Sequence, residues 1–477
     1  MPGYEGRAVL VAGARVAGRA SALALLGLGA EVTVIDRSDS PAMAELRDAG
    51  ATVLVGDVPD DALLERVSDV MVSPGFAPTH PLVVAAAEAG CEIYSEPELA
   101  WRLRRPGVSG QPPPWLAVTG TNGKTTVVTM LAAILAAAGL RTAALGNVGE
   151  PLVDAVLRTP ADQYDVIAVE LSSFQLHWSA TLAPQAGALL NLADDHLDWH
   201  GGFDAYAGAK ADVWRAADGV AIGNLDDPRA AALLAKAPGR RIGFTLGEPT
   251  AGQLGVTPGS ASGAATASGG ILTDCAFGDG PVPLMPVAEL RLAGRHNVAN
   301  ALAAAALARS HGVPPEAVRE GLAGYQPQPH RNAPVGTVGG VAYVDDSKAT
   351  NPHAAYGSLT AYPRVVWIAG GQLKGVDVDP LVAGVAARLG GVVLIGTDRA
   401  KIAEALRRHA PQVPVTDVAR TDDGAMAEAV ASAAALARPG DTVLLAPAAA
   451  SFDMFTGYAE RGDRFAAAVA ALPTRAH

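Results

Sequence analysis

The amino-acid sequence predicts an α/β protein of three domains. These are a Rossmann-like N-terminal unit, a central P-loop-type mononucleotide-binding unit and a Rossmann-like C-terminal unit. Three observations support this prediction. Short β-branched runs alternate with alanine-rich helical segments, which is typical of parallel sheets covered by helices. A glycine-rich loop follows a strand in the middle of the chain, and 477 residues are enough for about three domains.

The N-terminal domain opens with this alternating pattern. We expect a strand at residues 8–12, a helix at 17–28 and a second strand at 31–35, and the rhythm repeats with strands at 52–55 and 70–72. Strands that alternate with helices indicate a parallel sheet covered on both faces.

The turn after the first strand, Gly13-Ala14-Arg15-Val16-Ala17-Gly18, nearly matches a dinucleotide-binding fingerprint. However, Arg15 replaces the middle glycine, which is needed where the backbone approaches a pyrophosphate. Asp36 ends the second strand, where an acid would meet an adenosine ribose. A dehydrogenase is therefore one alternative. Our own hypothesis is that Arg15 or Arg37 binds a diphosphate, because each places positive charge beside a strand–helix turn.

The central domain begins with a strand at 115–119 that leads into the loop at 120–126, Gly-Thr-Asn-Gly-Lys-Thr-Thr. Glycines let the backbone approach a phosphate, Lys124 supplies charge, and the hydroxyl of Thr125 can join a magnesium coordination sphere. The general pattern has a glycine where this sequence has Val118, so the loop is a shorter variant.

Two further segments supply polar groups after strands. The strand at 165–170 ends in Glu170, a suitable position for a metal ligand or a helix cap. The turn at 191–200 follows a strand at 186–190 and contains three acids and two histidines. It is interpreted as a metal-binding rim, with a solvated loop as the alternative. Residues 246–270, rich in Gly, Ser, Thr and Ala, are expected to form an exposed loop.

The third domain again alternates, with strands expected at 341–344, 364–369, 392–395 and 442–445. Two linkers, at 105–114 and 325–329, are rich in proline. The expected domains are residues 1–107, 108–327 and 328–477.

Composition narrows the function classes. The net charge of −12 argues against a nucleic-acid partner, which needs a basic face. Two cysteines without a metal or redox spacing fit a reducing compartment. No signal segment is recognised, and the longest apolar run, 127–140, is too short for the ~20 residues that span a bilayer. We therefore expect a cytoplasmic protein with no membrane insertion.

The chain resembles the Mur ligases of peptidoglycan synthesis over nearly its whole length. The segments that carry the resemblance are 119–125, 170–176, 195–198 and 294–301. Segments similar to those of the D-glutamate-adding members are 73–75, 80–81, 345–352 and 450–453.

This resemblance implies an ATP-dependent, ADP-forming, amide-forming ligase that joins D-glutamate to UDP-N-acetylmuramoyl-L-alanine through an acyl phosphate. The reaction belongs to peptidoglycan precursor synthesis, and hence to cell wall biogenesis, cell shape and cell division. The resemblance further implies ATP, two Mg²⁺ ions and closure of the domains on ATP. We expect the protein to be a monomer.

Position by position, the resemblance implies a set of site residues. The catalytic residues are Lys124, Asn147, His196 and Lys210. The metal ligands are Thr125, Glu170, His196 and a carbamate on Lys210. The ATP-binding residues are Gly120, Thr121, Asn122, Gly123, Lys124, Thr125, Thr126, Asn297, Asn300, His330, Arg331, Asp346 and Lys348. The substrate residues are Ser73, Thr350, Lys374, Ser451 and Tyr458, together with Arg15 and Arg37 from our own hypothesis.

Alternatives remain beside this interpretation. A folylpolyglutamate synthase-like ligase would share the second and third domains but lack this first one. A non-catalytic nucleotide-binding protein would be expected to lose the set formed by Lys124, Glu170, His196 and Lys210. Without the resemblance, Lys210 would be interpreted as an exposed helix lysine.

Overall fold

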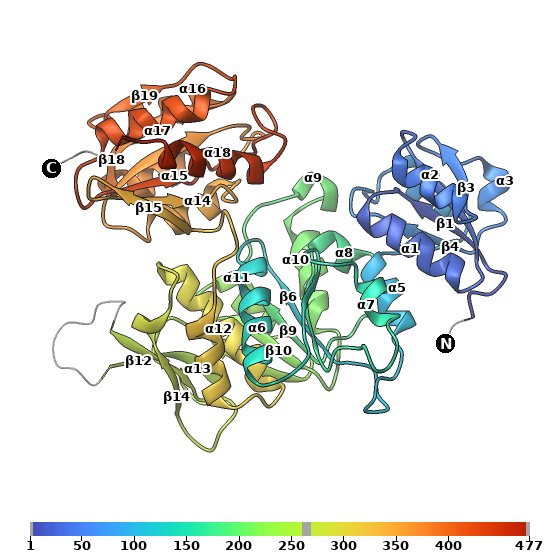
Figure 1. Ribbon diagram of the computed structural model, residues 1–477. Coiled ribbons are helices and arrows are strands. Elements are labelled where there is room, and N and C mark those ends of the chain that lie inside the picture. Colours follow the sequence, from blue (N-terminus) through green and yellow to red (C-terminus); the bar gives the residue numbers. More distant parts are fainter. Residues whose placement is uncertain (1–2, 260–268, 474–477) are drawn as a thin grey trace. The chain divides into compact units, whose positions relative to one another are not determined.

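The computed structural model describes residues 3–259 and 269–473. The chain divides into two compact units, one made of residues 1–289 and 299–324 and the other of residues 290–298 and 325–477. The described residues form three α/β sheets, two in the first unit and one in the second (Figure 1). The predicted α/β fold is therefore confirmed, whereas the exact domain boundaries remain a prediction.

The N-terminal sheet has five parallel strands in the order β3-β2-β1-β4-β5 within the described residues. β1 lies at the centre, which explains why its residues are apolar throughout. Polar residues start the helices: Ser40 and Ser95 each accept a hydrogen bond from a backbone N–H in the first turn. The elements are β1 (Ala8–Ala12), α1 (Val16–Gly27), β2 (Glu31–Asp36), α2 (Pro41–Asp48), β3 (Thr52–Val55), α3 (Asp61–Leu64), β4 (Asp69–Val72), α4 (Pro81–Glu88), β5 (Glu92–Tyr94) and α5 (Glu96–Leu103).

The central sheet has the order β14-β13-β12-β11-β10-β9-β6-β8-β7 in the described part of the chain. Its strands are parallel from β7 through β12, and β12, β13 and β14 pair antiparallel. Its strands are β6 (Trp115–Thr119), β7 (Ala144–Gly146), β8 (Ile167–Glu170), β9 (Ala186–Leu189), β10 (Val220–Asn224), β11 (Arg240–Phe244), β12 (Gln253–Pro258), β13 (Gly270–Asp274) and β14 (Val282–Pro286).

One prediction for this sheet was wrong. Residues 246–270 were expected to be a loop, but Gln253–Pro258 is strand β12, which pairs with β11 and β13. Its apolar residues Leu254 and Val256 sit in a glycine-rich context that hides the strand pattern, and pairing with β13 supplies the backbone partners. Residues 260–268 of that expected loop lie outside the described residues.

Helices of the central domain pack around this sheet, and α6 lies against α13 (Figure 1). Both have apolar faces, with Ile134 of α6 passing so close to Gly321 of α13 that a Cβ there would lie 2.4 Å from a backbone atom. The helices are α6 (Lys124–Ala137), α7 (Leu152–Val156), α8 (Ser173–His177), α9 (Leu197–His200), α10 (Phe203–Ala211), α11 (Pro228–Leu234), α12 (Arg295–Ser310) and α13 (Pro315–Gly324), with 3₁₀ turns at Asp212–Trp214 and Val287–Glu289.

The C-terminal sheet has the order β15-β16-β20-β17-β18-β19 among the described residues, with only the β15–β16 pair antiparallel. Its central strands β17 and β20 are wholly buried. The elements are β15 (Ala333–Val338), β16 (Val341–Asp345), α14 (Pro352–Leu359), β17 (Val365–Gly370), α15 (Asp379–Val385), a 3₁₀ turn at Ala386–Arg388, β18 (Leu389–Ile395), α16 (Arg399–His409), β19 (Val415–Asp417), α17 (Ala425–Leu436), β20 (Thr442–Leu445) and α18 (Tyr458–Ala470).

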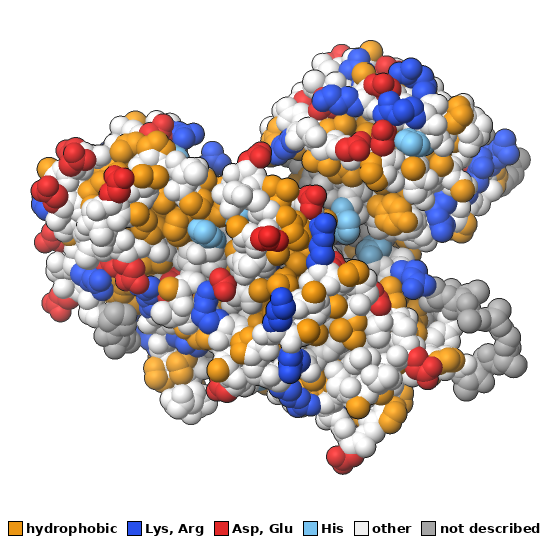
Figure 2. All heavy atoms as spheres, turned by 180° about the vertical axis from the view of Figure 1, so that it is seen from behind, with side chains coloured by type: hydrophobic (Ala, Val, Ile, Leu, Met, Phe, Trp, Pro, Cys, Tyr) orange, Lys and Arg blue, Asp and Glu red, His pale blue; other side chains and the backbone are white. Residues whose placement is uncertain are grey.

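The charges on the surface and the lengths of the helices bear on the partners that the protein can have. Lys and Arg side chains are interspersed with Asp and Glu on the face that Figure 2 shows, without a large field of one sign. Within residues 3–259 and 269–473, no helix has the length and apolar character needed to cross a membrane.

Candidate active site

A glycine loop joins β6 to α6 at the carboxyl end of the central sheet. Gly120 (φ 149°) and Gly123 (φ 86°) have backbone angles that favour glycine. A Cβ on Gly123 would lie 2.6 Å from Oδ1 of Asn300, and one on Gly120 would lie 3.0 Å from Cβ of Leu190. The loop therefore has room for glycine only at these two positions.

Lys124 is the first residue of α6, and its side chain folds back over the loop. Its Nζ donates hydrogen bonds to the carbonyl oxygens of Gly120, at 3.0 Å, and Thr121, at 3.1 Å. The N-terminus of α6 adds the partial positive charge of its helix dipole. This arrangement suits a phosphate group.

Glu170, at the end of β8, connects the loop to a second segment. Its carboxylate accepts hydrogen bonds from the Thr125 hydroxyl at 2.7 Å and from Nδ2 of Asn147 at 2.8 Å. The side chain is almost wholly buried. A hydroxyl and a carboxylate this close together are oxygen ligands of the kind that Mg²⁺ prefers, so these residues fit the predicted metal.

Lys210, on α10, is buried rather than exposed. The alternative of an exposed helix lysine, which would apply without the family resemblance, does not hold, because α10 turns this face toward the phosphate loop. Its Nζ donates to the Gly120 carbonyl at 2.8 Å and lies 4.8 Å from the Tyr206 ring centroid. Burial first, and then the charge of Lys124, lower the pKa of Lys210 well below its ordinary value.

A cavity of about 140 Å³ brings the predicted catalytic residues together. Lys124, Asn147, His196 and Lys210 all line it, although they come from four different segments. The prediction also assigned ATP binding to Gly120 and Thr121. It gave no role to the remaining lining residues, whose only signal was their place in or near the motifs. The complete lining is Gly120, Thr121, Lys124, Asn147, Ser172, Ser173, Phe174, Asp195, His196, Tyr206 and Lys210.

The interpretation of the turn at 191–200 as a metal-binding rim remains a prediction. Asp194 pairs with Arg229 and the imidazole of His200 lies against Ser173, whereas Asp195 and His196 lie together at the cavity. No group of three or more His, Cys, Asp or Glu side chains in the described residues is arranged to hold a metal. His196 lies at the cavity with a side chain that is 50% exposed. Its predicted metal role, with those of Thr125, Glu170 and Lys210, remains a prediction.

Aromatic rings surround His200 beside this cavity. The His200 ring stacks on Phe174 and meets Trp199 and Tyr206 at steeper angles. Burial is the main cause that lowers the pKa of His200 to about 4, and the nearby His177 is the next. His200 is therefore neutral at physiological pH.

In the second unit, the residues predicted to hold D-glutamate lie after the carboxyl ends of adjacent strands. Thr350 follows β16, Lys374 follows β17 and Ser451 follows β20. An isolated bridge between Gln372 and Ala450 links two of these loops. Lys374 is exposed and Ser451 is buried. The fold therefore gathers these segments at one edge of the sheet.

The predicted ATP residues of this unit already have partners. Asp346 accepts hydrogen bonds from the backbone N–H of Asn332 at 3.0 Å and from the Ser358 hydroxyl. Burial raises the pKa of Asp346 to about 6. Nζ of Lys348 lies 4.1 Å from the Tyr458 ring centroid. Among the remaining predicted residues, Arg331 is half-buried, Asn297 and Asn300 are buried, and His330 contacts Asp345 at 2.6 Å.

In the N-terminal domain, the turn after β1 is closely packed. A Cβ on Gly18 would lie 1.7 Å from the carbonyl oxygen of Gly13, and one on Gly13 would lie 2.7 Å from Oγ of Ser73. Asp36 accepts a hydrogen bond from the backbone N–H of Ala14 at 2.7 Å, so this acid closes the turn itself. Arg15, just before α1, is exposed. The other predicted arginine, Arg37, forms an ion pair with Asp57.

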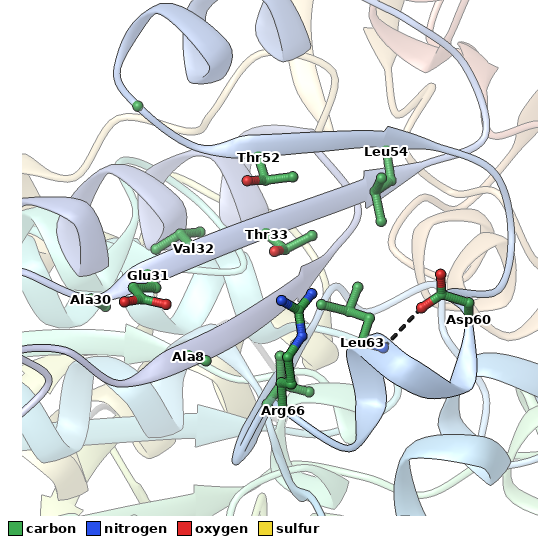
Figure 3. A pocket seen from close by; sticks show the side chains of 12 residues that line it. Ala8, Ala30, Glu31, Val32, Thr33, Thr52, Leu54, Asp60, Leu63 and Arg66 are labelled. Atoms are coloured by element: carbon green, nitrogen blue, oxygen red, sulfur yellow. Dashed lines mark hydrogen bonds between the residues drawn. The ribbon is translucent and has the colours of Figure 1, made fainter.

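A larger cavity, of about 540 Å³, also lies in the N-terminal domain. Figure 3 shows Arg66 beside Thr33, with Asp60 starting the short helix α3. Several lining residues, including Ala8, Glu31 and Thr52, begin their strands. Ligands of open parallel sheets bind at the carboxyl ends of strands, so this cavity is not the predicted substrate site.

Family comparisons match three consecutive regions of the chain. Residues 7–95 match the Mur ligase MurD-like N-terminal domain, residues 118–308 the Mur ligase middle domain and residues 330–449 the Mur ligase glutamate ligase domain.

The similar proteins agree with these matches. The chain is 55% identical to a UDP-N-acetylmuramoylalanine–D-glutamate ligase of Thermobifida fusca, with 98% of this chain and 99% of the relative covered. It is 52% identical to the ligase of the same name from Streptomyces coelicolor, with the same coverage. A crystal structure of UDP-N-acetylmuramate-alanine ligase from Thermotoga maritima has a TM-score of 0.58 and 18% identity, covering 97% of this chain and 99% of that one. This last likeness shows the shared fold.

Proposed function

The chain belongs to the Mur ligase family, and on this premise we propose that it joins D-glutamate to UDP-N-acetylmuramoyl-L-alanine with consumption of ATP. The observation that carries the proposal is the full-length identity of 55% with a ligase named for D-glutamate. The product is an amide in a peptidoglycan precursor. A folylpolyglutamate synthase-like ligase is not favoured, because the first domain matches the MurD-like model.

The main physical obstacle in this reaction is charge repulsion. The substrate carboxylate must attack the terminal phosphoryl group of ATP, and both reactants are anions. Lys124 and the N-terminus of α6 provide positive charge at the loop, where they stabilise the transferring group. The resulting acyl phosphate is attacked by the D-glutamate amine, and inorganic phosphate leaves.

Mur ligases use ATP and Mg²⁺. We infer that one ion is held by Thr125 and Glu170 and a second by His196 and modified Lys210. Bound Mg²⁺ neutralises phosphate oxygens and thereby lowers the repulsion between the two anions. Asn147 holds the Glu170 carboxylate at 2.8 Å and lines the same cavity, which supports a place for it beside the reacting carboxylate.

The environment of Lys210 supports a carbamate on its side chain. An ammonium at this buried position is unfavourable because Lys124 contacts the same carbonyl oxygen. The neutral amine can add to carbon dioxide, forming a C–N bond and releasing a proton. The product is an anion, which is an oxygen ligand suited to a magnesium ion.

We further propose that Thr350, Lys374 and Ser451 hold the D-glutamate carboxylates near Tyr458, because their loops lie at one edge of the C-terminal sheet. Residues Asn297, Asn300, Arg331, Asp346 and Lys348 are proposed to bind ATP. The protein is proposed to act as a monomer in the cytoplasm.

Phosphate release from ATP tests the function directly. The purified protein with UDP-N-acetylmuramoyl-L-alanine is expected to release phosphate with D-glutamate and much less with L-glutamate or other amino acids. A Lys124→Ala variant should abolish the signal, which excludes a contaminating ATPase. Strong preference for another amino acid would overturn the proposal.

A further inference from the structure

One buried histidine beside the cavity has no role in the proposed reaction. His200 is the last residue of α9 and is only 9% exposed. Its Nε2 lies 3.0 Å from Oγ of Ser173, the first residue of α8. Ser173 is also buried and lines the cavity that contains Lys124 and Lys210. The pair therefore connects an aromatic cluster to the candidate active site.

The surroundings of His200 exclude the charged form. Its ring stacks on Phe174, with centroids 5.7 Å apart and planes 8° apart, and it lies 4.5 Å from Trp199 and 5.4 Å from Tyr206. No carboxylate of the described residues forms an ion pair with it. An imidazolium here would be buried without a counter-charge, which is costly. The ring is thus neutral, with one N–H and one acceptor nitrogen.

The position of that single proton follows from the partners of the two nitrogens. The buried Nδ1 of His200 has no hydrogen-bond partner in the part of the chain that the structure describes. A buried N–H without a partner is rarer than a buried acceptor without one. The proton is therefore on Nε2, and the ring donates it to Oγ of Ser173.

The direction of this hydrogen bond determines which further hydrogen bond the Ser173 hydroxyl can form. Its oxygen accepts the hydrogen bond from His200, so its own hydrogen remains available for a ligand in the cavity. In the proposed reaction, the phosphate loop, Lys124 and Thr125 bind the phosphoryl group. Ser173 starts a different helix and lines the cavity together with Asn147 and His196.

We propose that His200 is a positioning residue that fixes the Ser173 hydroxyl as a hydrogen-bond donor to an anionic oxygen at the reacting end of the UDP-linked substrate. This inference rests on the proposed function, because it requires that substrate in the cavity. It assigns His200 to substrate binding rather than to metal binding, despite its position in the turn with His196.

Kinetics of four variants test the proposal. Ser173→Ala and His200→Phe, which keeps an aromatic ring, should each raise KM for the UDP-linked substrate about tenfold, the usual effect of one hydrogen bond to a charged group. KM for ATP should stay unchanged. His200→Gln, which keeps an N–H at a similar reach, should recover most of the affinity. The double variant Ser173→Ala/His200→Phe should have a KM for the UDP-linked substrate no higher than that of Ser173→Ala alone.

The proposal would be overturned if His200→Gln and His200→Phe raised KM for the UDP-linked substrate equally. It would also be overturned if the increases in KM caused by the two single substitutions were additive in the double variant. An unchanged KM in Ser173→Ala would also overturn it. His311→Gln serves as a control, because this histidine contacts Gln185 elsewhere in the domain. Its KM values should match those of the wild type.

A spectroscopic measurement separates this inference from the proposed function. Nitrogen-15 NMR of histidine-labelled wild-type protein, with the His200 signals identified by their loss in His200→Phe, should show a proton on Nε2. A proton on Nδ1 would overturn the inference even in an active enzyme. If the wild type failed to use the UDP-linked substrate, the proposed function would fail whatever the tautomer.

Discussion

Nζ of Lys210 lies 2.8 Å from the carbonyl oxygen of Gly120, and Nζ of Lys124 lies 3.0 Å from the same atom. Two lysines from different helices thus meet on one oxygen of the phosphate loop. Such proximity disfavours two ammonium groups and gives a physical reason for modifying the more buried one. The geometry links phosphate binding to the proposed carbamate.

Lys210→Ala is expected to lower the turnover number by roughly 100-fold or more, because an electrostatic group at the reacting centre is lost. Added short carboxylates, such as formate or acetate, should restore part of the activity by occupying the vacated space. Phosphate release measures both effects. Lys236→Ala, at an exposed position of the same domain, should behave as wild type. An unimpaired Lys210→Ala enzyme would remove the metal role.

Thr125→Val should lower the turnover number by roughly 100-fold and raise the Mg²⁺ concentration needed for half-maximal activity, because the hydroxyl next to Glu170 is lost. Thr125→Ser should retain most activity. The matched control is Thr129→Val, one helical turn later, where the hydroxyl bonds to the backbone carbonyl of Thr125. Identical Mg²⁺ titrations for Thr125→Val and wild type would contradict the assignment.

The two arginines of the first domain are expected to differ. Arg15→Ala should raise KM for the UDP-linked substrate several-fold, because this exposed side chain lies at the start of α1. Arg37→Ala should have a smaller effect, since its guanidinium is paired with Asp57. Steady-state kinetics at saturating ATP would measure both values. If neither variant changes this KM, the diphosphate hypothesis fails.

Glu96→Gln is expected to stabilise the protein above neutral pH. Glu96 is buried and accepts a hydrogen bond from the Val153 N–H at 2.7 Å, and burial raises its pKa from 4.5 to about 7. The folded state therefore binds more protons than the unfolded state between these values, and stability is lost as pH rises through that window. Glutamine keeps an acceptor without the charge.

The Tm of Glu96→Gln should exceed that of wild type at about pH 8, by an amount corresponding to at most ~3 kcal/mol, and the difference should narrow toward about pH 5. Thermal unfolding monitored by circular dichroism across this range is the measurement. Glu88→Gln, at an exposed position, should show no such trend. A difference that does not vary with pH would rule out the ionisation of Glu96 as its cause.

Much of the fold was predictable because its signals are local. The strands at 8–12, 52–55, 115–119 and 442–445 have the bounds predicted for them, since continuous apolar runs between turns mark buried parallel strands. The phosphate loop was equally clear, because glycines must stand where the backbone angles and close neighbours require them. The strand at Gln253–Pro258 was missed because its pairing partners lie elsewhere in the chain.

The sequence by itself determined the fold class, the phosphate loop and the family, because each depends on residue types at fixed local spacing. Only the tertiary structure decided that Lys210 is buried and that its Nζ contacts the Gly120 carbonyl. It likewise decided that Asn147 and Thr125 both donate hydrogen bonds to the Glu170 carboxylate. It also decided that His200 faces Ser173. These relationships depend on how distant segments pack, and local residue patterns carry no information about the distances between them.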